Sequence, residues 1–169
     1  MKRHSVLIPL TLIVMLWGIF AGFVYFTSAQ LPDRVATHFN ASGIPNGWMT
    51  RGTHIEFTLL MGLVIPAFVL ALFSLVRRFP GLMNIPYKDY WLAPERRQQT
   101  FNFIQQQGFR FAAMFILFFA GIHWSILCAN RQNPAILSNT QVGWIGGAFT
   151  AAAALWVLVF IVHFLRKPA

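Results

Sequence analysis

The chain has 169 residues, of which 57% are hydrophobic and only 10% are charged. A soluble globule of this size cannot bury so much apolar surface, so the composition excludes a water-soluble domain and predicts a membrane protein. The formal net charge of +9 would suggest a nucleic-acid partner in a soluble protein, but here the basic residues flank apolar segments. They therefore predict contact with lipid headgroups and no nucleic-acid binding.

Four apolar stretches are long enough to cross a bilayer, whose hydrocarbon core needs roughly 20 such residues in a helix. They are residues 6–26, 55–76, 111–129 and 142–165. We therefore predict an all-α fold, an integral membrane four-helix bundle that forms one domain over residues 1–169.

The basic residues predict the orientation of this bundle. They gather before the first span, between the second and third spans, and after the fourth, at Lys2, Arg3, Arg77, Arg78, Lys88, Arg96, Arg97, Arg110, Arg166 and Lys167. By the positive-inside rule, both termini and the loop at 79–107 are cytoplasmic. The loop at 28–53 then faces outward.

Small residues predict one helix contact. The first span carries Gly18 and Gly22, and the fourth carries Gly143, Gly147 and Ala151 at the same interval of four. Such residues let membrane helices approach closely, which predicts contact between the first and fourth helices. The alternative is that these residues are simply common in membrane helices.

The outer loop is rich in turn-forming residues. Pro32 ends the first helix, residues 40–43 can form one turn, and residues 44–47 can form a second with Pro45 at its second position. Trp48 is expected at the level of the headgroups. Two turns in so few residues predict a compact loop.

The second span is expected to begin at Thr53. Its hydroxyl would cap the helix, and Glu56 three positions later would complete a capping box. Glu56 would then have a structural role.

A metal site is a competing interpretation of the outer end. His38, His54, Glu56 and His123 could bind zinc or another transition metal, the only cofactor that the sequence suggests. The chain would then be a metal-dependent membrane hydrolase. Because His54 and Glu56 are two apart in a helix, they point to different faces. The alternatives are a His38 that fastens the loop by hydrogen bonds and a His123 that makes a buried polar contact between helices.

The cytoplasmic loop mixes aromatic rings with positive charge. We expect a contact surface for an acidic partner or for headgroups, made by Tyr87, Lys88, Tyr90, Trp91, Arg96 and Arg97. A helix is expected to begin at Pro94. It is either an amphipathic helix in the inner interface or an extension of the third span.

Two segments resemble a known family. The loop LPDRVATHFNASGIPNGW (31–48) and the segment NIPYKDYWLAPERR (84–97) are similar to the bacterial membrane domain of unknown function found at the N-terminus of SdpI-type immunity proteins. Ala36 stands where that pattern usually has proline. The resemblance covers the first two helices well and the last two poorly.

The resemblance implies a multi-pass protein of the bacterial inner membrane that senses or neutralises an extracytoplasmic peptide. It also implies functional roles for Pro32, His38, Asn40, Gly43 and Pro45, to which we add Trp48 as a binding residue. Our first hypothesis is a non-enzymatic protein that binds a peptide or protein through the outer loop. The alternatives are the metal-dependent hydrolase and an accessory subunit of a larger membrane complex. We also expect self-association, since four short spans enclose little space.

Overall fold

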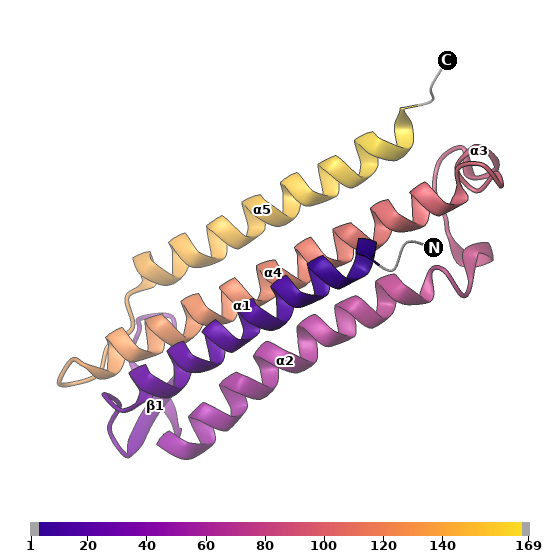
Figure 1. Cartoon of the computed structure of the whole chain (residues 1–169). Helices are drawn as coiled ribbons and strands as arrows, with labels where there is room; N and C mark the ends of the chain where they lie inside the picture. The colour runs from indigo at the N-terminus through magenta and orange to yellow at the C-terminus, as the bar shows by residue number, and fades with distance from the viewer. Residues whose placement is uncertain (1–3, 167–169) are drawn as a thin grey trace.

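The computed structural model describes residues 4–166. Its elements are α1 (His4–Ser28), β1 (Arg34–Phe39), β2 (Pro45–Thr50), α2 (Arg51–Leu75), the 3-10 helix η1 (Pro80–Leu82), α3 (Lys88–Trp91), α4 (Arg97–Asn130) and α5 (Asn139–Leu165). The four long helices lie side by side, with the two strands at one end of the bundle and α3 at the other (Figure 1). Lys2, Arg3 and Lys167, which contribute to the predicted orientation, lie outside the described residues.

The four predicted spans correspond to the four long helices. Within residues 4–166, Val6–Ser28, Arg51–Leu75, Arg97–Asn130 and Asn139–Leu165 are long and apolar enough to cross a membrane. Large apolar side chains on the outward faces of α1, α2 and α5 are exposed. Helices that are apolar all round and not covered by protein are typical of membrane spans. The chain is therefore a multi-pass membrane protein.

Helix α4 is the centre of the bundle. It packs against α1, α2 and α5, and it buries Ala112 and Ile116 completely. Ile116 joins Phe20 and Val24 of α1 in one apolar cluster. Helix α5 packs mainly on α4 and lies at the edge of the bundle (Figure 1).

The predicted contact between the first and fourth helices is wrong. A Cβ atom added at Gly18, Gly143 or Gly147 would meet nothing within 4 Å. The close approaches occur instead on α2 and α4, where a Cβ on Gly62 would collide with Phe20 and one on Gly108 would collide with Phe73. Both outer helices pack on α4, which keeps the small-residue faces of α1 and α5 away from each other.

The polar segment before the third span is a continuous extension of that span. Helix α4 runs unbroken from Arg97, so the amphipathic helix lying separately in the interface is not observed. The expected start at Pro94 is also wrong, because residues 93–96 form turns. The extension is stable because Phe101 and Ile104 pack against Met83 and Phe164.

The loop between α1 and α2 contains a two-stranded antiparallel hairpin that the all-α prediction lacked. The turn at 40–43 is confirmed, since the Gly43 N–H donates to the Asn40 carbonyl at 2.9 Å. The second turn is wrong, because Pro45 and Gly47 belong to β2. Proline is compatible with the first residue of an edge strand, where its missing N–H costs no ladder bond.

The start of α2 also differs from the prediction. The strand β2 runs directly into the helix, so Thr50 is the cap residue, and its hydroxyl accepts a hydrogen bond from the Thr53 N–H at 3.1 Å. Glu56 is exposed and takes no part in a capping box. The cap lies three residues earlier than expected because no loop separates the strand from the helix.

The contact at Gly108 provides a test of the packing of α2 on α4. A Cβ there would lie 2.7 Å from Phe73 Cβ, an atom close to the backbone that cannot easily move. We expect Gly108→Ala to lower the free energy of unfolding by about 1–3 kcal/mol. Gly18→Ala is the matched control, since open space surrounds Gly18, and it should not destabilise the protein. Thermal denaturation in detergent measures both, and equal stability of the two variants would contradict this packing.

Candidate functional site

A chain of buried hydrogen bonds lies beneath the hairpin. His54 Nε2 and His123 Nδ1 are 3.1 Å apart, and His123 Nε2 lies 2.8 Å from the Thr27 hydroxyl. That hydroxyl donates to the Phe23 carbonyl at 2.6 Å. His54 and His123 are almost completely buried, with 2% and 0% of their surface exposed. These hydrogen bonds connect α1, α2 and α4 at the end of the bundle that carries the hairpin.

The bonding pattern assigns the protons of the two rings. The Thr27 hydroxyl has a single hydrogen, which it donates to the Phe23 carbonyl, so His123 Nε2 must donate to the hydroxyl oxygen. With both rings neutral, the other nitrogen of His123 is an acceptor, so His123 Nδ1 accepts from His54 Nε2. His54 Nδ1 is then an acceptor with no hydrogen-bond partner among residues 4–166.

Ring packing fixes the pair in place. The His54 and His123 rings are stacked with centroids 5.3 Å apart and an interplanar angle of 16°. The Phe23 ring meets His123 edge-on at 5.4 Å. His123 therefore makes the buried polar contact between helices that the sequence offered as one alternative.

The four predicted metal ligands do not converge. His38 lies exposed on β1, with its Nδ1 atom 3.4 Å from the neighbouring Thr37 hydroxyl, and Glu56 is exposed on α2. Within residues 4–166 no group of three or more His, Cys, Asp or Glu side chains could hold a metal ion. A catalytic zinc site usually takes three protein ligands, and His54 and His123 supply two.

Asn130 fastens the hairpin to the bundle. Its Oδ1 atom accepts from the Ala36 N–H at 2.8 Å, and its Nδ2 atom donates to the Ala36 carbonyl at 2.9 Å. The same Nδ2 atom donates to the Ile126 carbonyl at 2.9 Å. One amide side chain at the end of α4 thus occupies both backbone groups of Ala36, as a neighbouring strand would. Beside it, Val35 is completely buried.

Two of the predicted binding residues shape the hairpin turn. Asn40 Oδ1 accepts from the N–H groups of Ser42 and Ile44, at 2.9 and 3.0 Å. Gly43 has a φ of 76°, and a Cβ there would lie 2.4 Å from the Leu137 carbonyl oxygen, so only glycine fits.

The segment between α4 and α5 holds this turn from outside. The Leu137 N–H donates to the Gly43 carbonyl at 2.9 Å, and Asn139 Nδ2 donates to the Ala41 carbonyl at 2.8 Å. At the base of the hairpin, Arg51 forms an ion pair with Asp33. The hairpin is thus fixed at its base, along β1 and at its turn.

The other predicted loop residues lie on or near the hairpin surface. Pro32 follows the end of α1 and is exposed, and Pro45 is half-buried at the start of β2. The Trp48 side chain is 46% exposed, and the Arg34 guanidinium lies 5.1 Å from the centre of its ring. This cation–π contact holds an aromatic and a cationic group together on one surface.

The outer edge of β2 carries unpaired backbone groups. Trp48 lies opposite Ala36, whose backbone groups point away from β2 toward Asn130. In such a non-hydrogen-bonded pair both residues direct their N–H and C=O groups away from each other. The backbone N–H and C=O groups of Trp48 therefore point away from β1. Within residues 4–166, β2 pairs only with β1, so no strand meets these groups.

At the opposite end, the predicted contact residues mostly bind within the chain. Trp91 Nε1 donates to the Phe164 carbonyl at 3.1 Å and its ring stacks on His163. The other contacts are Lys88 Nζ to the Gly81 carbonyl, Arg96 over the Tyr90 ring and Arg97 over the Phe101 ring. Tyr87 is half exposed in a left-handed conformation, with a φ of 52°. A role of these residues toward a partner stays a prediction.

Asn130 was not among the predicted site residues. A signal for it exists, because Asn130 follows His123 by seven residues, which is two helical turns and places both on one face of α4. Thr27 was not among the predicted site residues either, because its role depends on the arrangement of three helices.

Part of the chain is similar to a known protein family. Residues 7–65 match a family described as a domain of unknown function, DUF1648. This segment is about a third of the chain and holds most of α1, the hairpin and the first part of α2. No curated protein and no solved structure matches the chain. The match agrees with the part of the chain in which the family resemblance is strongest, and it carries no information about immunity.

The buried histidine pair gives a prediction about stability. His123→Leu removes the acceptor of the buried His54 N–H, so it should lower the free energy of unfolding by about 1–2 kcal/mol. The same change at the exposed His38 should cost less than about 0.5 kcal/mol. Thermal denaturation in detergent compares the two. Equal losses would show that the buried bonds contribute nothing.

The hydrogen bonds of Asn130 to Ala36 give a prediction about local opening of the hairpin. Asn130→Asp keeps an acceptor for the Ala36 N–H but removes the donor to the Ala36 and Ile126 carbonyls. Amide hydrogens at 34–50 should exchange about tenfold faster, which corresponds to about 1.4 kcal/mol. Asn46→Asp, an exposed change on the same hairpin, is the control and should leave exchange unaltered. An unchanged exchange rate in Asn130→Asp would show that these hydrogen bonds do not hold the hairpin in place.

Proposed function

We propose that this chain is a multi-pass protein of the bacterial inner membrane that binds an extracytoplasmic peptide or protein through the hairpin. The observation that carries the proposal is the free edge of β2 at Trp48, where unpaired backbone groups lie beside an exposed indole ring. An extended peptide can add to such an edge as a third strand, with backbone hydrogen bonds for affinity and side chains for specificity.

The rigidity of the hairpin supports this proposal. A binding edge that is already ordered loses little conformational entropy when a ligand adds to it. Here Asn130 holds β1, and Leu137 and Asn139 hold the turn. Because Asn130 already occupies the outer edge of β1 at Ala36, β2 offers the accessible edge.

The distribution of charge supports an outward-facing hairpin. The end that carries η1 and α3 has Arg77, Arg78, Lys88, Arg96 and Arg97, whereas the hairpin end has only Arg34, Arg51 and Arg131 among residues 4–166, and Arg51 pairs with Asp33. An excess of Arg and Lys marks the cytoplasmic side of a membrane protein. The hairpin would then meet ligands outside the cytoplasm.

Binding rather than catalysis fits the groups that this surface offers. The exposed part of the hairpin carries aromatic, cationic and backbone groups at Arg34, His38 and Trp48. These are recognition groups, and an Arg beside a Trp is a common centre of a binding interface. The buried His54 and His123 stabilise the base of this surface.

Site-specific photocrosslinking in intact cells tests the proposal. A photoreactive amino acid at Asn46, an exposed neighbour of the free edge, should crosslink to an exported peptide or protein. The same group at Leu82, which is 83% exposed at the opposite end, should not. Crosslinks from Asn46 to cytoplasmic proteins would overturn the orientation.

Two substitutions at Trp48 separate edge recognition from side-chain recognition. Trp48→Ala removes the ring and keeps the outward N–H, while Trp48→Pro removes both without breaking a bond between β1 and β2. We expect the crosslink yield to fall in the alanine variant and at least severalfold further in the proline variant. Hydrogen exchange over 34–50 checks that the hairpin stays formed. Equal yields in the two variants would exclude strand addition at this edge.

A further inference from the structure

A groove opens between α1 and α4, at the end of the bundle opposite the hairpin. Its volume is about 310 Å³. Apolar residues make most of its wall, and two polar residues complete it: Pro9, Leu12, Ile13, Phe109 and Ala113, with Gln106 and Arg110. The groove is therefore amphiphilic.

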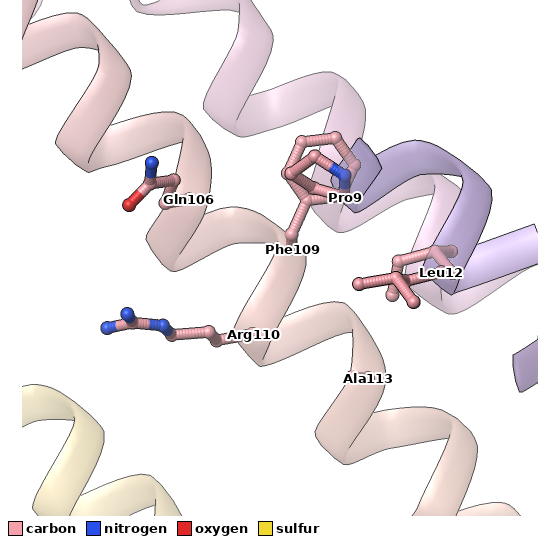
Figure 2. Close-up of a pocket in the computed structure, with 7 residues that line it drawn as sticks. Pro9, Leu12, Gln106, Phe109, Arg110 and Ala113 are labelled. Atoms are coloured by element: carbon pink, nitrogen blue, oxygen red, sulfur yellow. The ribbon is translucent and has the colours of Figure 1, made fainter. Parts of the chain in front are cut away.

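The two polar residues act from one side of α4. Gln106 and Arg110 are four apart in the helix and lie on the same face. Figure 2 shows both side chains extending on the side of α4 that faces away from Pro9 and Leu12 of α1, although both residues line the groove. Both residues are exposed, and Arg110 has no hydrogen bond or ion pair with any other residue in 4–166.

The protein supplies no counter-charge for Arg110. The chain has only four acidic residues, Asp33, Glu56, Asp89 and Glu95, and none of them lines the groove. Asp33 pairs with Arg51, and Glu95 pairs with Arg96. An arginine near the end of a membrane span directs its charge to the interface, so the groups that meet the Arg110 guanidinium come from the surroundings.

The position of Arg110 along α4 indicates what those surroundings are. Residues 111–130 contain no Asp, Glu, Lys or Arg, and at 1.5 Å per residue they extend about 30 Å, the thickness of a hydrocarbon core. At the far end of this stretch Arg131 lies over the Trp124 ring. Arg110 and Arg131 thus mark the two boundaries of the apolar stretch, and Arg110 lies at the level of the lipid phosphates.

We propose that this groove binds one anionic phospholipid. The Arg110 guanidinium holds the phosphate in a charge-assisted, bidentate hydrogen bond, and the Gln106 amide donates a further bond. One acyl chain lies along Leu12, Ile13 and Ala113. The net negative charge of the lipid compensates Arg110, which a zwitterionic lipid does only in part. This site is separate from the hairpin and its ligand.

Native mass spectrometry of the full chain in detergent tests the proposal with added phosphatidylglycerol and phosphatidylethanolamine. Wild-type protein should bind one phosphatidylglycerol about tenfold more tightly than one phosphatidylethanolamine. Arg110→Gln should lose about tenfold in affinity for phosphatidylglycerol and lose the preference. Arg78→Gln, an exposed basic residue at the same end but outside the groove, should behave like wild type. Equal losses in both variants would mean general attraction to basic residues and would overturn the site.

A second variant tests the acyl-chain part of the groove. Ala113→Leu fills the groove while retaining Arg110, and it should also weaken phosphatidylglycerol binding. Inorganic phosphate at millimolar concentration should not displace the lipid; displacement would mean that only a phosphate is recognised. Phosphatidylglycerol should raise the melting temperature of the wild type and of Arg78→Gln, and not that of Arg110→Gln. A stabilisation equal in all three proteins would also overturn the site.

Discussion

The fold depends on hydrogen bonds between buried polar groups at the hairpin end of the bundle. One face of α4 makes two sets of these bonds. His123 connects the three helices α1, α2 and α4 inside the bundle, and Asn130, two turns further on, binds the backbone of Ala36. An unmet donor is costly in a buried site, so these bonds select one relative position of the helices and one position of the hairpin. The surface that carries Trp48 is held in place by these two residues.

Much of the architecture was predictable because long apolar stretches have only one common solution in a bilayer. The four helices and the turn that ends at Gly43 follow from local patterns of hydrophobicity and turn chemistry. Element boundaries were less predictable. The strands of the hairpin were missed because β2 begins with proline and contains glycine, two residues that are rare in strands.

The candidate site was only partly predictable, because it consists of contacts between residues far apart in the chain. His54 and His123 were both predicted as metal ligands, but their pairing depends on how α2 lies on α4. His38 and Glu56 looked equally suitable as ligands, yet both face outward. The helix contact predicted from glycine spacing was wrong for a similar reason, because α4 lies between the two helices whose small residues were expected to meet.

The hairpin depends on parts of the chain outside the segment that matches a known family. Asn130 lies 94 residues from Ala36, and Asn139 lies 98 residues from Ala41, whereas the matched segment ends at residue 65. The unit of sequence similarity is therefore smaller than the unit of folding. An isolated fragment with the boundaries 7–65 would keep both strands but lose the amides that hold them.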